Sequence, residues 1–462
     1  MNMSFLPHEL IVDNFAGGGG TSTGLEQAFG RPVDIAINHD PKALAMHRIN
    51  HPDTKHYCES VWDIDPIEVT GNQPVGLVWL SPDCKHFSKA KGGKPVEKKI
   101  RGLAWIALRW ASKTRPRVIM LENVEEFKTW GRIAEDGKPC PKHKGETFRS
   151  FVRALRYQGY LVEWRVLRAC DYSAPTIRKR FFMVARRDGL SISWPVATHG
   201  DPKSKAVQKG LLKPYRTAAE CIDWSIECPS IFTRARPLVT ATLERIAGGL
   251  KKFVFDNPEP FIINGMVPVL TECANASNKR AMPIDEPLRT ICAQTKGGHH
   301  ALIAPSLVVN TTGHHGNGVN NPLHTIATGG HHGLVSAFLA KNYTEVRAFL
   351  TAFYGNEKDG NSVDEPLRTI PTRDRFGLVT VGQHQYRIVD IGFRMLQPVE
   401  LFRAQGFPDN YIFEKGLDEN GTEIRLTKTE QARMVGNSVC PQLSKALAEA
   451  NFKHEFTYRS VA

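Results

Sequence analysis

The fold class follows from one stretch near the N-terminus, ELIVDNFAGGGGTSTGLEQAFG at residues 9–30. An apolar run is broken by four glycines at positions 17–20, and apolar residues then return at helical spacing at Leu25 and Ala28. This pattern predicts a strand, a tight loop and a helix, with a loop that lets a ligand approach the backbone closely. The loop has neither the dinucleotide G-x-G-x-x-G spacing nor a Walker lysine, which favours a nucleoside with a small tail over a phosphate group. A purely structural turn is the alternative.

The flanking sequence continues the same alternation. Apolar strands are predicted at VDIAINHD, VGLVWLS, RVIMLENV, LVEWRVLRA and RFFMVARR, with helices around residues 102–112 and 148–158. Strands that alternate with helices indicate an α/β fold with a doubly wound, mostly parallel sheet. Ligands of such sheets bind at the carboxyl ends of the strands.

Composition excludes several classes of protein. The chain has 462 residues, of which 41% are hydrophobic and 23% charged, as in globular proteins and unlike disordered ones. It shows neither a transmembrane run nor an export signal, so a cytoplasmic protein is expected, with no membrane partner. The nine cysteines form no paired framework, which indicates free thiols in a reducing compartment.

The positive charge is concentrated in one segment. The net charge is +13, and residues 85–117 hold eleven Lys or Arg against the single acid Glu97. A polyanionic partner is therefore expected. Phosphate contacts are predicted for the cations that directly follow Cys84, namely Lys85, Lys89, Lys91 and Lys94. The alternative is an ordinary solvated basic face.

Chemically reactive side chains stand at the ends of predicted strands. Cys84 follows an apolar strand, and the cations after it favour its thiolate, although a lone cysteine is more often a core residue. Glu122 ends the next strand, where a carboxyl group can protonate or hydrogen-bond a heteroaromatic ring while a thiolate adds to it. Arg178 and Arg180 are two apart on an extended segment and so face the same side, where they can orient that carboxyl group or hold a phosphate.

The middle of the chain contains a repeat. Pro-Leu-x-Thr-Ile units begin at Pro287, Pro322 and Pro366, each after a polar turn and before a short apolar strand. Such self-similarity predicts stacked units, and we expect a separate strand-rich domain at residues 191–385 between segments 1–190 and 386–462. The histidine pairs match no compact zinc signature, so no metal site is predicted. Contacts with DNA bases are predicted for four residues of one turn, His314, His315, Asn317 and Asn320. A purely structural repeat is the alternative.

Five blocks in this order resemble the motifs of the DNA cytosine-5 methyltransferases. They are DNFAGGGG, SPDCKHFS, ENV, RKR, and LQPVELFRAQGFPDNYIF followed by VGNSV. Each block is weak alone, but the ordered set is specific and covers residues 8–190 and 390–450. Three positions depart from the usual pattern. Asp83 separates Pro82 from Cys84, Asn38 stands where a glutamate is usual, and Thr176 stands where a glutamine is common.

The resemblance implies methyl transfer from S-adenosylmethionine to carbon 5 of a flipped-out cytosine in a specific sequence of double-stranded DNA. Cys84 would be the nucleophile, Glu122 would contact the ring nitrogen and exocyclic amine, and Arg178 would support the base. The residues implied around the cofactor are Phe15, Gly17, Gly18 and Gly20, Asn38 and His39, Glu59 or Ser60, and Asn437 and Ser438. The setting implied is restriction-modification or the protection of phage or host DNA, and a companion restriction endonuclease is a further candidate partner.

Three other readings stay open. An amino-group methyltransferase needs an aromatic residue where SPDC places a thiol. An RNA cytosine methyltransferase is possible on the same motifs, although such relatives tend to carry a smaller insert than the one of about 200 residues expected here. A noncatalytic DNA-binding module would not need Cys84 and Glu122 together.

Overall fold

A computed structural model describes most of the chain and divides it into two compact units. The described residues are 9–82, 102–132, 134, 139–257, 259–263, 266–273, 281–291, 293, 299–309, 346, 349, 378–381 and 384–456. The first unit comprises Met1–Cys221, Pro287–Thr295 and Gln397–Ala462, and the second comprises Ile222–Glu286 and Lys296–Leu396. Across these described ranges, no helix is long and apolar enough to cross a membrane.

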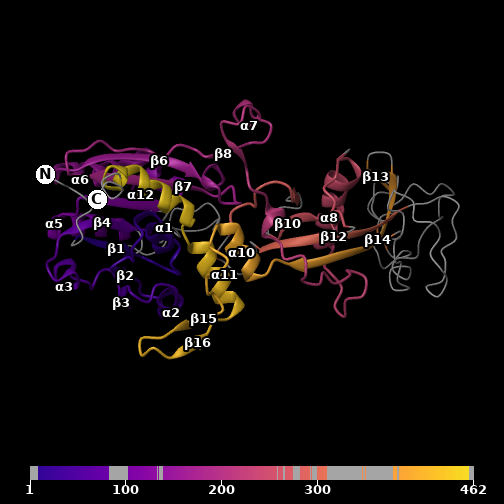
Figure 1. Ribbon diagram of the computed structural model, residues 1–462, viewed down its shortest axis with the longest axis horizontal. Helices are drawn as coiled ribbons and strands as arrows, with labels where there is room; N and C mark the ends of the chain where they lie inside the picture. The colour runs from indigo at the N-terminus through magenta and orange to yellow at the C-terminus, as the bar shows by residue number, and fades with distance from the viewer. Residues whose placement is uncertain are drawn as a thin grey trace. The chain divides into compact units, whose positions relative to one another are not determined.

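The first unit is built on a seven-stranded sheet in the order β3-β2-β1-β4-β5-β7-β6 (Figure 1). Its strands are β1 (Leu10–Asn14), β2 (Ile35–Ile37), β3 (Lys55–Tyr57), β4 (Val75–Leu80), β5 (Val118–Asn123), β6 (Leu161–Arg168) and β7 (Lys179–Arg186). Neighbouring strands are parallel except that β7 runs antiparallel to β5 and β6. The carboxyl ends of β1, β2, β3, β4 and β5 therefore share one edge of the sheet.

The central strands are buried on both faces because successive side chains point to opposite sides. In β4, Val78 and Leu80 pack into one hydrophobic core, while Leu77 and Trp79 pack into the other. One core includes residues of α5 and α6, and the other includes residues of α1 and α12. Figure 1 shows α12 alongside α1, where Phe29 and Phe452 meet edge to face at 5.2 Å. The predicted α/β class with a mostly parallel, doubly wound sheet is confirmed.

The remaining elements of the first unit are helices and two pairs of short strands, of which β8 and β9 are parallel and β15 and β16 antiparallel. The α-helices are α1 (Gly20–Phe29), α2 (Pro41–Asn50), α3 (Pro66–Thr70), α5 (Ile106–Lys113), α6 (Glu146–Tyr157), α7 (Lys205–Gln208), α10 (Pro398–Gln405), α11 (Lys428–Asn437) and α12 (Pro441–Phe456). The 3-10 helices are η2 (Leu103–Trp105), η3 (Glu125–Thr129), η4 (Pro141–His143), η5 (Ala169–Tyr172) and η6 (Ala218–Cys221). The short strands are β8 (His199–Gly200), β9 (Lys213–Pro214), β15 (Lys415–Leu417) and β16 (Glu423–Arg425).

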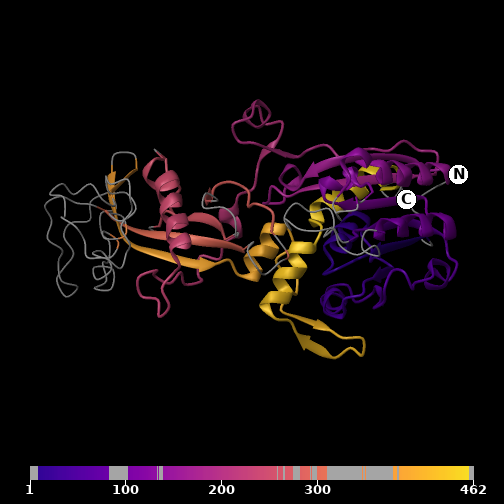
Figure 2. The same cartoon turned by 180° about the vertical axis from the view of Figure 1, so that it is seen from behind.

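The second unit is strand-rich and antiparallel. Its sheet has the order β11-β10-β12-β14-β13, formed by β10 (Val269–Cys273), β11 (Ala281–Pro283), β12 (His299–Val309), β13 (Leu378–Val381) and β14 (His384–Met395). Both views show β12 and β14 running side by side (Figures 1 and 2). Helix α8 (Thr240–Leu250) continues into the π-helix η7 (Lys251–Phe255), and both pack on this sheet through Ile246, Leu250 and Val254.

The boundaries between the two units differ from the boundaries expected for the 191–385 segment. Residues 191–221 belong to the first unit, where Asn451 of α12 holds Ser193 through two hydrogen bonds. Residues 386–396 belong to the second unit because β14 pairs with β12. The first Pro-Leu-x-Thr-Ile unit also lies in the first unit, where the Leu288 amide and carbonyl pair with Pro175 and Ile177 at 2.9 and 2.8 Å. The second and third repeats lie outside the described residues.

Candidate active site

The glycine loop joins the end of β1 to α1 and is shaped by residues with positive φ, Phe15 (62°), Gly17 (55°) and Gly19 (90°). The four glycines serve different needs. A Cβ on Gly17 would meet only the Phe15 carbonyl oxygen at 3.8 Å, so this side of the loop is open. A Cβ on Gly18 would crowd Met46 and Met434, and one on Gly20 would overlap the Val439 carbonyl oxygen. Gly17 therefore leaves room for a ligand, while Gly18 and Gly20 permit close packing.

The structure brings the VGNSV block against this loop. Gly20 packs beside Ser438, whose Cβ would lie 3.1 Å from a Cβ on Gly20. Ser438 is buried, its hydroxyl donates to the Met434 carbonyl at 2.9 Å, and its own carbonyl accepts from the Gln405 side chain at 2.7 Å. Asn437 ends α11 and is exposed. Two segments more than 400 residues apart in the chain thus form one surface.

The other predicted cofactor residues follow the ends of β2 and β3 at the same sheet edge. Asn38 donates its backbone amide to the Tyr57 carbonyl at 3.1 Å, and its side-chain oxygen accepts from the Asp40 amide at 2.8 Å. This Asx turn starts α2, which Asp40 caps. His39 and Glu59 are exposed, and Ser60 is half-buried. All four residues thus follow strands whose carboxyl ends share this edge of the sheet.

Asn14 adds an unsatisfied polar group to this edge. It ends β1 and is 1% exposed, yet neither atom of its carboxamide has a hydrogen-bond partner among the described residues. Buried polar groups are normally paired, so an orphaned amide beside the open side of the loop fits a polar ligand. The residues present thus fit S-adenosylmethionine, with Asn14 as a position that sequence reasoning missed. The available signal was its place at the strand end, inside the DNFAGGGG block.

Glu122 is the buried carboxyl group of the site. It lies in β5, and Arg180 of β7 approaches it with Nε 3.1 Å from Oε1. Burial raises the pKa of Glu122, and the positive charges of Arg180 and Arg178 oppose that increase. A raised pKa makes proton donation easier near neutral pH, because more of the acid form is present. Glu122 can therefore act as a hydrogen-bond or proton donor to a ring nitrogen.

Arg178 is almost fully buried and is held by the chain of the first repeat. Its Nη1 donates to the Ile291 carbonyl at 3.2 Å, and its backbone amide donates to Thr176 Oγ1 at 3.3 Å. The charges of Arg178 and Arg180 both lower the pKa of Glu122 against the larger effect of burial, and the roles predicted for the two arginines stay predictions. Thr176, which stands where a glutamine is common, has a structural role in this turn.

The strand ends that flank the predicted nucleophile are tied together. Asn123 Nδ2 donates to the Pro82 carbonyl at 3.2 Å, and the Ser81 amide donates to the Asn14 carbonyl at 3.2 Å. Pro82 is two residues before Cys84, and Asn123 directly follows Glu122 in the chain. Sequence reasoning did not single out Asn123, although it belongs to the ENV block.

A second thiol lies close to these charges. Cys440 is buried, and burial raises its pKa to about 11 against the opposing effect of Arg178 and Arg180. It therefore stays a neutral thiol at neutral pH and is no rival nucleophile. Cys58, Cys140, Cys170, Cys221 and Cys440 are free thiols. Within the described part of the chain, no cluster of His, Cys, Asp and Glu could hold a metal ion.

Nine predicted site residues lie outside the described residues. They are Cys84 with Lys85, Lys89, Lys91 and Lys94, and the turn residues His314, His315, Asn317 and Asn320. Their predicted roles stay predictions.

Comparison with solved structures supports the fold. A crystal structure of a Spodoptera frugiperda DNMT2 mutant matches with a TM-score of 0.50 at 14% identity, covering 96% of this chain and 99% of that one. The Entamoeba histolytica methyltransferase EhMeth also matches with a TM-score of 0.50, at 13% identity, covering 97% and 99%.

Comparison of sequences identifies the family. The chain is 29% identical over 221 residues to the Type II methyltransferase M.AquIA of Picosynechococcus, covering 46% of this chain and 87% of the relative. It is 32% identical over 193 residues to M.NgoMIV of Neisseria gonorrhoeae, covering 41% and 56%, and the matches to M.XorII and M.SacI span about half of those relatives. The profile of the C-5 cytosine-specific DNA methylases matches residues 10–243 and 306–453. Since this match covers most of the chain and includes both the glycine loop and the ENV and VGNSV blocks, the chain belongs to the C-5 cytosine-specific DNA methylase family.

Proposed function

We propose that this chain transfers a methyl group from S-adenosylmethionine to carbon 5 of a cytosine flipped out of duplex DNA. The observation that carries the proposal is the ion pair between buried Glu122 and half-buried Arg180, because Asn123, the residue after Glu122, donates to the Pro82 carbonyl two residues before Cys84. In a member of this family, such a carboxyl group and an adjacent thiol suit addition to a pyrimidine ring.

The chemistry follows from what each side chain can do. The Cys84 thiolate forms a bond to carbon 6, while Glu122 donates a hydrogen bond or proton to the ring nitrogen and offsets the charge that develops there. Carbon 5 thereby becomes an enamine-like nucleophile. Bound S-adenosylmethionine supplies the electrophilic methyl group. Once carbon 5 carries the methyl group, water takes its proton, and the electrons of that carbon–hydrogen bond expel the thiolate from carbon 6. The ring nitrogen returns its proton to Glu122, which restores the aromatic ring and the starting state of both side chains. A stacked base cannot be reached in this way, which is why base flipping is part of the proposal.

The cofactor part of the proposal assigns the open side of the glycine loop to S-adenosylmethionine. Asn14 and Gly17 lie at the β1 end, Asn38 at the β2 end and Ser60 at the β3 end, so a nucleoside can extend along the sheet edge. The exposed side chains of His39 and Glu59 can contact polar groups of the nucleoside.

We assign the recognition of DNA bases to the second unit, and the sequence-independent electrostatic attraction to DNA to the basic segment after Cys84. Charge reversal at Lys89, Lys91 and Lys94 should weaken binding to all duplexes alike and reduce its salt dependence. Alanine at His314, His315, Asn317 and Asn320 should relax or shift the methylated sequence, whereas Asn420→Ala, in the β15–β16 turn, serves as the control.

The relatives named Type II methyltransferases support a restriction-modification role, with a companion endonuclease as candidate partner.

The decisive experiment combines Cys84→Ser with a trapping substrate. Bisulfite sequencing of DNA from cells that express the wild type should show 5-methylcytosine in one sequence context, and Cys84→Ser should abolish it. Cys140→Ser is the matched control, because Cys140 is a half-buried free thiol with no predicted role in the site. A duplex with 5-fluorocytosine at the target should form a covalent adduct with wild type, since fluorine cannot leave as a proton does. Methylation by Cys84→Ser, or no adduct under turnover conditions, would refute the addition mechanism.

A further inference from the structure

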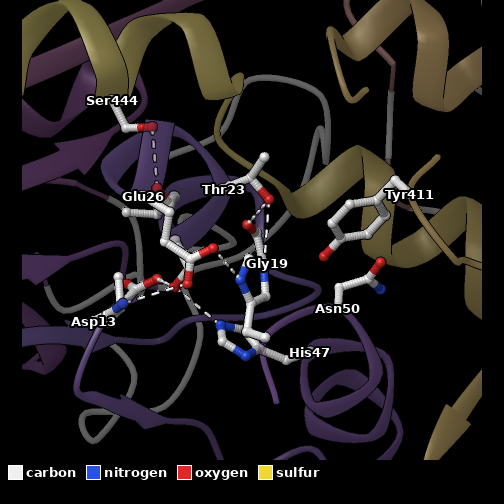
Figure 3. Close-up of polar contacts among 12 residues, drawn as sticks. Asp13, Gly19, Thr23, Glu26, His47, Asn50, Tyr411 and Ser444 are labelled. Atoms are coloured by element: carbon white, nitrogen blue, oxygen red, sulfur yellow. Dashed lines mark hydrogen bonds and ion pairs between the residues drawn. The ribbon is translucent and has the colours of Figure 1, made fainter. Parts of the chain in front are cut away.

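A largely buried polar network lies against Gly18 and Gly19 of the glycine loop. It joins α1, α2 and the segment after α10, and Figure 3 shows Thr23, Glu26 and Tyr411 gathered around Gly19. None of its side chains is among the residues predicted to contact the cofactor.

Tyr411 reaches the loop from the C-terminal part of the chain. Its hydroxyl donates to the Gly18 carbonyl, and burial raises its pKa so that it stays a neutral donor. The next residue is anchored to α2 by Asn50, whose carboxamide donates to the Ile412 carbonyl at 2.7 Å and accepts from the Ile412 amide at 2.8 Å. The Tyr411 hydroxyl is therefore held in place by a paired backbone.

Thr23 holds the peptide that follows Gly19, and His51 lies against the Thr23 hydroxyl. Thr23 Oγ1 donates to the Gly19 carbonyl at 2.8 Å and lies 3.4 Å from His51 Nε2, while His51 Nδ1 lies 2.9 Å from Glu26 Oε2. A Cβ on Gly19 would lie 2.7 Å from His51 Nε2 and would overlap the Tyr411 hydroxyl, so these two side chains fill the space directly behind Gly19.

The two carbonyl contacts determine the shape of the loop. A peptide unit is planar, so a hydrogen bond that fixes a carbonyl also fixes the amide on its other side. Tyr411 and Thr23 fix the consecutive peptides that follow Gly18 and Gly19. The open face at Gly17 is then formed before a ligand arrives, and a preformed site binds with a smaller ordering cost.

We propose that Tyr411, Thr23 and His51 are positioning residues that preorganise the glycine loop for S-adenosylmethionine, without touching it. The proposal rests on the cofactor assignment made above. It predicts a selective loss of cofactor affinity when one of these supporting hydrogen bonds is removed.

The test compares two tyrosines whose hydroxyl groups donate to different backbone carbonyls, one inside the glycine loop and one outside it. Tyr411→Phe removes the donor to Gly18, and Tyr160→Phe is the matched control, because the buried Tyr160 hydroxyl donates to the Pro116 carbonyl at 2.7 Å in the same unit. Titration calorimetry with S-adenosylmethionine and no DNA should show a Kd about tenfold higher for Tyr411→Phe. The Kd of Tyr160→Phe should stay within about twofold of wild type, and kcat at saturating cofactor should be nearly unchanged in both.

A second pair keeps the test decisive if Tyr411→Phe does not fold. Thr23→Val removes the side-chain donor to the Gly19 carbonyl without changing shape and leaves the donation from the Thr23 backbone amide at 2.9 Å in place. Thr70→Val is its control, because Thr70 Oγ1 donates to the Pro66 carbonyl at 2.7 Å, also four residues back. Higher Kd in Thr23→Val alone supports positioning. An unchanged Kd, or equal weakening in a variant and its control, would overturn it. If wild type itself fails to bind S-adenosylmethionine, the cofactor assignment is wrong, which is a distinct result.

Discussion

Asp13 provides a sharp test of the electrostatics beneath the cofactor loop. It lies in β1, its side chain is 0% exposed, and Ser22 Oγ donates to Oδ2 at 2.8 Å while Oδ1 has no partner among the described residues. Burial raises the pKa of Asp13 to about 7, opposed by the hydrogen bonds from Ser22. The folded protein should therefore keep this proton over a pH range in which the unfolded chain has lost it.

The sign and size of the pH effect on the free energy of unfolding follow from the difference in proton binding between the folded and unfolded states. Between about pH 4 and pH 7 the folded state binds the extra proton, so the free energy of unfolding falls as pH rises, by about 1.4 kcal/mol per pH unit and at most about 4 kcal/mol in total. Above about pH 7 this effect is constant. Asp13→Asn resembles the protonated carboxyl group and does not titrate. The free energy of unfolding of the variant relative to wild type should therefore grow by about 2–3 kcal/mol between pH 5 and pH 8.

The assay is urea unfolding at several pH values, with native-state hydrogen exchange of β1 as the local measurement. The low pKa values of His47 and His56, caused chiefly by burial, affect both chains and largely cancel in the difference. Asp188→Asn is the control: the hydrogen bond from Arg186 lowers the pKa of Asp188 despite its burial, so its difference should be flat above about pH 5. A flat difference for Asp13→Asn would show that Asp13 is ionised in the folded protein and would refute the reasoning.

Three further changes test the packing and the site. Gly20→Ala should destabilise by about 1–3 kcal/mol in thermal unfolding, because its Cβ overlaps the Val439 carbonyl oxygen, whereas Gly30→Ala, with a φ of 66° and no atom within 4 Å, should cost about 1 kcal/mol. Arg180→Gln should raise the pKa of Glu122 further and so move the pH profile of kcat to higher pH. An unmoved profile would show that the protonation of Glu122 does not control kcat. Asn123→Ala should lower kcat with little change in the Kd for S-adenosylmethionine, since it frees the Pro82 carbonyl; a change in Kd alone would contradict this role.

The strands and the glycine loop could be predicted from the sequence because their formation depends on residues close together in the chain. The apolar strands and the glycine loop follow from spacing and from the conformational freedom of glycine, which depend on near neighbours in the chain. The position of Glu122 at the carboxyl edge follows in the same way, since it ends an apolar strand. The ordered blocks then pointed to the family, which the comparisons confirm.

Contacts between distant segments were not readable, because a hydrogen bond leaves no pattern in the sequence of either partner. Tyr411 and Gly18 are 393 positions apart, and Asn50 and Ile412 are 362 apart. The docking of the first repeat against Arg178 belongs to the same class, because the motif that it shares with two other segments carries no sign of this contact. Periodicity assigns a residue to a face of its own element, but the partner across that face depends on which buried donors and acceptors the packed chain brings together.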